Sequence, residues 1–98
     1  MKRTSIILCC GHNGRAVIYG RVDGEPLPGQ AVTLHDARMI LRWDAACGGL
    51  LGLAAGGPQK DTRITQAVPY VTETVWQEVV AVSDGAAKAI DDWQAYRV

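Results

Sequence analysis

The chain has 98 residues, of which 48% are hydrophobic and 20% are charged, the balance of one ordinary globular domain spanning residues 1–98. Ten basic and ten acidic side chains cancel, which excludes the bulk positive charge that holds nucleic acid or an anionic membrane, although a local patch is compatible with it. No apolar run approaches the roughly 18 residues of a membrane span. The odd cysteine count, three, favours a reducing cytoplasm over a disulfide scaffold.

The first two predicted strands form a hairpin. Residues 4–10 are β-branched and apolar on both faces, as expected of a central strand. An Asn-Gly pair lies within residues 11–14 and favours the positive φ of a tight turn, after which residues 16–22 return as the second strand. A connection rich in Gly and Pro leads to a third, short strand at residues 31–34.

Residues 38–43 fit two local structures. On a period of two, Met39, Leu41 and Trp43 share one face and the two arginines share the other. On a helical period, Met39, Ile40 and Trp43 group together, with Asp36 as an N-cap. We favour the strand, because the Gly-containing segment that follows would end a helix after only two turns.

A short helix is predicted next. Leu50, Leu53 and Ala54 fall at positions i, i+3 and i+4, which form one helical face. The glycine pair at 56–57 and the proline after it are expected to end this helix. Because two turns are unstable alone, we expect Leu50, Leu51 and Leu53 to pack onto the strands.

The rest of the chain predicts strands followed by a terminal helix. Residues 62–65 read as a short strand with Ile64 inward, residues 68–71 as extended chain and residues 74–82 as a longer strand. A helix starts at residues 83–84, and its apolar stripe runs from Ala86 through Ala89 and Ile90 to Trp93. The predicted fold is α+β: a small, mostly antiparallel, curled β-sheet or barrel with one short internal helix and a C-terminal helix.

Three stretches carry a resemblance to a known family. They are T-L-x-D-A-R-M-x-L-x-W, G-G-L-L-G-L-A-A-G-G-P, and T-R-I-T-x-A-V-P followed by V-x-E-V. Over about Val17 to Trp93 the chain is similar to small phage and prophage proteins of unassigned function. The resemblance implies a phage-encoded protein made in the bacterial cytoplasm. It transfers no active site, because none of these stretches is a catalytic motif.

The cysteines and histidines give weak signals for chemistry. Cys9, Cys10 and His12 lack the Cys-x-x-Cys spacing of a zinc site, and adjacent strand residues point to opposite faces, so buried packing is the favoured interpretation. Cys47 and His35 are a conceivable nucleophile and base, but no third orienting group is evident. We therefore expect no metal and no cofactor.

The arginines suggest a ligand. Arg38 and Arg42 are predicted on one strand face, with Arg63 nearby and His35 on the same segment. Such a set could hold a phosphate or carboxylate bidentately. The competing interpretation is an ordinary solvated or interfacial strand face.

These features predict a non-enzymatic phage accessory protein that acts by binding, as a homo-oligomer. Its partner would be another copy of itself together with a host or defence protein, or a small nucleotide-like ligand to be sequestered. A virion structural component is the first alternative, and a small enzyme that uses Cys47 or His35 is the second. The apolar side chains expected in the core or at the subunit interface are Trp43, Leu50, Leu51, Leu53, Trp76 and Trp93.

Overall fold

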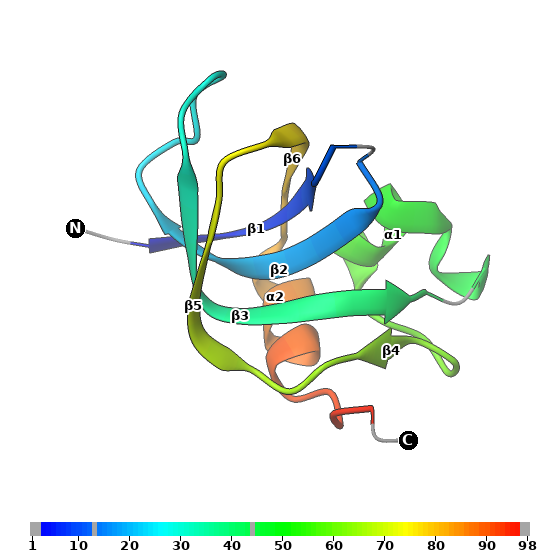
Figure 1. The fold of residues 1–98 in the computed structure, drawn as a ribbon. Coiled ribbons are helices and arrows are strands. Elements are labelled where there is room, and N and C mark those ends of the chain that lie inside the picture. The colour runs from blue at the N-terminus through cyan, green and yellow to red at the C-terminus, as the bar shows by residue number, and fades with distance from the viewer. Residues whose placement is uncertain (1–2, 13, 44, 97–98) are drawn as a thin grey trace.

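The computed structural model describes residues 3–12, 14–43 and 45–96 and contains a curled sheet with two short helices on one side (Figure 1). The predicted α+β class is confirmed. The strands are β1 (Arg3–Cys10), β2 (Ala16–Asp23), β3 (Val32–Arg42), β4 (Arg63–Ile64), β5 (Val68–Glu73) and β6 (Trp76–Ala81). The helices are the 3₁₀ turn η1 (Ala45–Cys47), α1 (Gly49–Gly56) and α2 (Asp84–Asp91).

The strands pair antiparallel in the order β4-β3-β2-β1-β6, and β5 pairs with β3 on the same edge as β4. The predicted hairpin of β1 and β2 is present, with Ile7 opposite Tyr19; Asn13 of its turn lies outside the described residues. Although β6 follows β5 directly in the chain, these two strands do not pair with each other. The sheet is therefore curled but not closed into a barrel.

One long strand, β3, replaces the two strands predicted at 31–34 and 38–43. The strand continues through residues 35–37, which were expected to separate the two strands. A β-bulge at this point accommodates the extra residue without ending the strand. Tyr19 pairs with Arg38 and Arg21 with His35, so β3 advances three residues while β2 advances two. Asp36 sits in this bulge with φ 52°. The strand alternative for 38–43 is confirmed, but Trp43 lies beyond the strand end and packs on the helix side, so its predicted placement beside Met39 and Leu41 is wrong.

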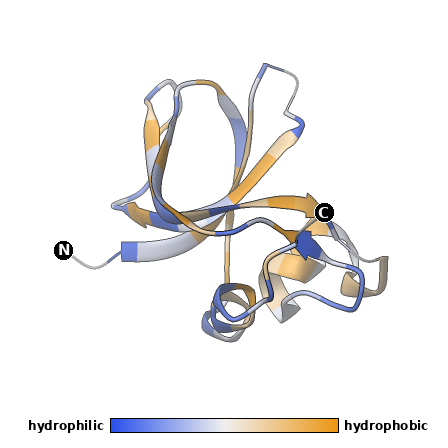
Figure 2. Ribbon diagram, turned by 60° about the horizontal axis from the view of Figure 1, so that its bottom comes forward, coloured by the Kyte–Doolittle hydropathy of each residue, from blue (hydrophilic) through white to orange (hydrophobic). Residues whose placement is uncertain are grey.

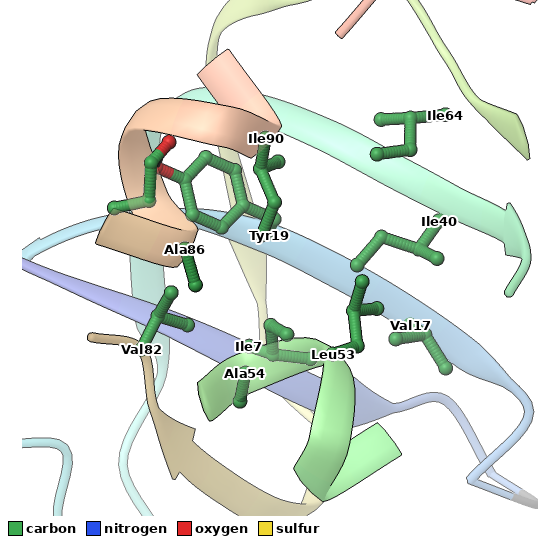
Figure 3. Packing of buried hydrophobic residues seen from close by; sticks show 11 residues of the cluster. Ile7, Val17, Tyr19, Ile40, Leu53, Ala54, Ile64, Val82, Ala86 and Ile90 are labelled. Atoms are coloured by element: carbon green, nitrogen blue, oxygen red, sulfur yellow. Dashed lines mark hydrogen bonds between the residues drawn. The ribbon is translucent and has the colours of Figure 1, made fainter. Parts of the chain in front are cut away.

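Both faces of the sheet are buried along β1 and β2, as the apolar run in β1 predicted. Ile7, Tyr19 and Ile40 point to the side covered by the helices, where Leu53 and Ile90 pack against them (Figure 3). Leu8, Cys10, Ile18 and other alternate residues form a second cluster inside the curl, together with partly buried Val71, Trp76 and Val79.

The two helices differ in character: α1 is made only of Gly, Ala and Leu, whereas α2 alternates polar and apolar residues (Figure 2). In α1, Leu53 and Ala54 are buried and Leu50 packs against the helix-side cluster. Leu51 was predicted to pack with them, but it is 67% exposed because it points to the opposite side of the helix. In α2, the predicted start at residues 83–84 is confirmed, and the Ser83 hydroxyl caps the helix by accepting a hydrogen bond from the amide of Ala86 at 3.1 Å.

The end of α2 differs from the prediction. The helix stops at Asp91, so Trp93 lies just beyond it rather than within it. Trp93 nevertheless packs against the helix-side cluster, and its Nε1 donates to the carbonyl of Thr62 at 3.0 Å. The predicted docking of the C-terminal segment by this indole is therefore confirmed.

Candidate functional site

Arg38 is a structural residue. Its side chain is buried with 5% exposure, and its Nε donates to the carbonyl of Thr65 at 2.7 Å. Its two terminal nitrogens donate to the carbonyls of Ile90, of Asp91 at 3.4 Å and of Trp93 at 2.8 Å. Burial lowers the pKa of this guanidinium. Because backbone carbonyls occupy all of its nitrogens, Arg38 does not join Arg42 in the arginine pair predicted from strand alternation.

The end of α2 explains why an arginine is buried there. The last carbonyls of a helix lack intrahelical partners and carry its partial negative charge. Asp91 is the last residue of α2, and its carboxylate is repelled by the partial negative charge at this end of the helix. Arg21 forms a salt bridge with this carboxylate, and the hydroxyl of Tyr19 donates a hydrogen bond to it at 3.0 Å. The hydrogen bond to Asp91 raises the pKa of Arg21. Arg38 and Arg21 thus offset the negative charge at the C-terminal end of α2, Arg38 by contacting its carbonyls and Arg21 by contacting the Asp91 carboxylate.

His35 lies in the other half of β3. Its Nε2 is 3.5 Å from a carboxylate oxygen of Asp23, whose other oxygen accepts from Arg3 at 3.0 Å. Tyr70 is its cross-strand neighbour in β5. These contacts make His35 part of a partly exposed polar network with Asp23 and Arg3, separate from the other predicted ligand residues.

Arg42 and Arg63 are brought together. They are directly paired across β3 and β4, and both are exposed. The guanidinium of Arg63 lies 4.8 Å from the centre of the Tyr96 ring. Among the described residues, neither arginine forms a salt bridge. Two of the four predicted ligand residues are therefore neighbours on adjacent strands.

The structure gives Cys47 and His35, the conceivable nucleophile and base, different neighbours. Cys9 and Cys10 point to opposite faces of β1, and burial raises the pKa of Cys10 to about 11, with the charge of Glu73 adding to the effect. Cys47 lies in η1, where its sulfur is 3.8 Å from the hydroxyl of Thr62, whereas His35 contacts Asp23. Within residues 3–12, 14–43 and 45–96, no three metal-ligating side chains cluster.

An exposed apolar surface lies on β3 and the start of β5. Met39, Leu41 and Val68, here called the apolar rim, are 39%, 50% and 45% exposed. Met39 and Val68 line a cavity of about 170 Å³ whose floor includes buried Ile18 and Ala37. The cavity is large enough for one aliphatic side chain.

The apolar rim adjoins an unpaired strand edge. In the described part of the chain, β5 pairs with β3 on one side and with no strand on the other. Unpaired edge groups can hydrogen-bond an added strand. Pro69 lacks an N–H, so it restricts pairing near the start of this edge.

Some of these residues were foreseeable from sequence and others were not. The period-two pattern predicted that Met39 and Leu41 share a face, but it gave no sign that this face is solvent-exposed. Tyr96 carried no signal, because its position against Arg63 depends on the chain after α2 turning back along β4. That return is fixed by the amide of Tyr96, which donates to the carbonyl of Ile64 at 2.8 Å.

Comparison with known proteins identifies one family. A domain of unknown function, DUF6948, matches residues 3–93, and the chain belongs to this family. No curated protein and no solved structure matches the chain. None of the helices in the described ranges combines the length and apolar character needed to cross a membrane.

Proposed function

We propose that this member of the DUF6948 family is a non-enzymatic binding protein that self-associates through the apolar rim. The observation that carries the proposal is the apolar rim itself: Met39 and Val68 line an open cavity, Leu41 is exposed two residues further along β3, and the free edge of β5 lies beside them. Apolar patches of this kind, bordered by polar residues, are typical of protein interaction sites.

A second copy of the chain is the occupant that best fits the surface. Ten basic and ten acidic side chains cancel, so little long-range repulsion opposes association of identical subunits. A two-fold dimer would bury the apolar rim of both subunits in one closed interface, the commonest symmetry for soluble oligomers.

The biological setting of the proposal comes from the sequence resemblance. The segments at 33–43 and 48–58 resemble those of small phage and prophage proteins, so we place the protein among phage accessory proteins acting in the host bacterial cytoplasm. In that setting, the assembled protein would bind a host or defence component.

Light scattering on the purified protein at micromolar concentrations tests the proposal. The expected mass is a multiple of the 10.5 kDa chain. Met39→Glu and Leu41→Glu should each shift the protein to the monomer, because an interface tolerates a buried unpaired carboxylate poorly. Leu51→Glu is the matched control, since Leu51 is 67% exposed but lies on α1, outside the rim.

Two outcomes would reject self-association through this surface. One is a wild-type protein that scatters as a 10.5 kDa particle throughout the concentration range. The other is dissociation by Leu51→Glu to the same extent as by the two rim variants.

A further inference from the structure

We propose that Arg42 and Arg63, supported by Tyr96, form a binding site for a phosphate group. This site is independent of self-association, because its two arginines are paired across β3 and β4 and are not part of the apolar rim. In Figure 1, β4 and the C-terminal segment lie together, away from the beginning of β1.

The first argument is the electrostatic repulsion between Arg42 and Arg63. Arg42 and Arg63 are partners beside an irregularity in the ladder, because β3 advances two residues from Ile40 while β4 advances only one from Ile64. Like charges that face each other on neighbouring strands destabilise a sheet. The salt bridges found among the described residues involve Arg3, Arg21, His35 and Lys88, and they leave out both members of this pair. A bound anion would offset the repulsion that these residues otherwise sustain.

The second argument is that Arg63 is oriented before any ligand arrives. Its guanidinium lies over the ring of Tyr96 at 4.8 Å, a cation–π distance. Tyr96 is in turn fixed to β4 by its amide, which donates to the carbonyl of Ile64 at 2.8 Å. A guanidinium held on one face keeps its edge nitrogens available, so less conformational freedom is lost when it binds an anion.

The third argument is the space beside Tyr96. A hollow of about 410 Å³ is lined by Lys60, Thr62, Trp93 and residues 94–96. Neither arginine lines this hollow, but Tyr96 borders it and also contacts Arg63, so the hollow adjoins the arginine pair. It adds a lysine and two aromatic residues, which are residue types that accompany phosphate recognition when the phosphate carries a ring.

These features together select the ligand chemistry. Guanidinium groups bind phosphate oxygens through parallel, charge-assisted hydrogen bonds, and two of them match a dianion better than a single carboxylate. Trp93 and Tyr96 extend the site toward an organic group. The phosphate could belong to a small nucleotide or to the backbone of a single-stranded nucleic acid.

Calorimetric titration of the full chain at fixed ionic strength distinguishes these sources. The probes are inorganic phosphate, AMP, a ten-residue oligo-dT, and uncharged adenosine as the ligand without phosphate. We expect AMP or the oligonucleotide to bind and adenosine not to bind. Arg42→Gln and Arg63→Gln should each weaken that binding by about tenfold or more, as expected for the loss of a charge-assisted contact.

The matched control is Arg3→Gln. It removes the same charge from an exposed arginine in β1, where Arg3 pairs with Asp23 at 3.0 Å, and it should leave the affinity unchanged. Binding of AMP alone would identify a nucleotide site, and binding of the oligonucleotide alone would identify a nucleic-acid site. The proposal is overturned if no phosphate-bearing probe binds, or if Arg3→Gln weakens binding as much as the two site variants.

Discussion

The guanidinium of Arg38 donates a hydrogen bond to the backbone carbonyl of Trp93 at 2.8 Å. The same side chain reaches Ile90 at the end of α2 and Thr65 after β4. One residue of β3 thus joins its own strand to two distant parts of the chain, the residue after β4 and the end of α2. The C-terminal segment is held in place partly by a buried cation that the sequence pattern had suggested for ligand binding.

Arg38→Ala should therefore destabilise the fold by about 3–5 kcal/mol, because buried carbonyls lose their donors and a cavity forms. Arg38→Lys should restore little of this loss, since one ammonium cannot span acceptors on both β4 and α2. Chemical denaturation measures both values. Arg42→Ala is the control and should change the free energy of unfolding by less than about 0.5 kcal/mol, as at other exposed sites; equal losses at 38 and 42 would contradict the assignment.

Trp93 should contribute through packing and through one hydrogen bond. Trp93→Ala is expected to cost about 3 kcal/mol, at the low end for a large aromatic because this side chain is only partly buried. Trp93→Phe should cost about 1 kcal/mol, since it keeps most of the packing but leaves the carbonyl of Thr62 without its donor. A loss below about 1 kcal/mol for the alanine variant would mean that the segment is peripheral.

Local patterns in the sequence predicted most of the fold. The apolar run in β1, the start of α2 at residues 83–84 and the inward Ile64 each follow from local sequence patterns, and each is present. The bulge at Asp36 was not predictable, because it is set by the register of β3 against β2 rather than by residues 35–37 alone.

The candidate sites were less accessible to sequence reasoning. Strand alternation placed Arg38 and Arg42 on one face, but alternation does not reveal that α2 ends above Arg38 and uses its guanidinium. The pairing of Arg42 with Arg63 depends on β4 returning to β3 after more than twenty residues. Side chains that meet through such long-range pairing leave no periodic signal.

Alkaline pH should destabilise the protein. Burial, with a contribution from Glu73, raises the pKa of Cys10 from 9.0 to about 11, and burial also raises the pKa of Cys9 and of Tyr19. The folded protein then keeps protons that the unfolded chain loses, so the free energy of unfolding falls as pH rises from about 9 towards 11. Below that window these groups contribute no pH dependence.

Denaturation between pH 8 and 11 measures this effect. Cys10→Ala should lower the free energy of unfolding at every pH but make its decline above pH 9 shallower, because one of the raised groups is gone. An unchanged slope in Cys10→Ala would show that the buried thiol is not the group that loses its proton.

Two helical glycines should respond in opposite directions to alanine. A Cβ atom on Gly52 of α1 would lie 1.8 Å from the carbonyl oxygen of Cys47, so the backbone of η1 would have to move. We expect Gly52→Ala to lower the free energy of unfolding by about 3 kcal/mol, the upper part of the range for overpacking.

A Cβ atom on Gly85 of α2 would meet nothing within 4 Å. Gly85→Ala should therefore raise the free energy of unfolding by up to about 1 kcal/mol, because alanine has the higher helix propensity and restricts the unfolded chain. Thermal and chemical denaturation of both variants decide the matter: if Gly52→Ala is tolerated as well as Gly85→Ala, the close approach of η1 to α1 is not a feature of the folded protein.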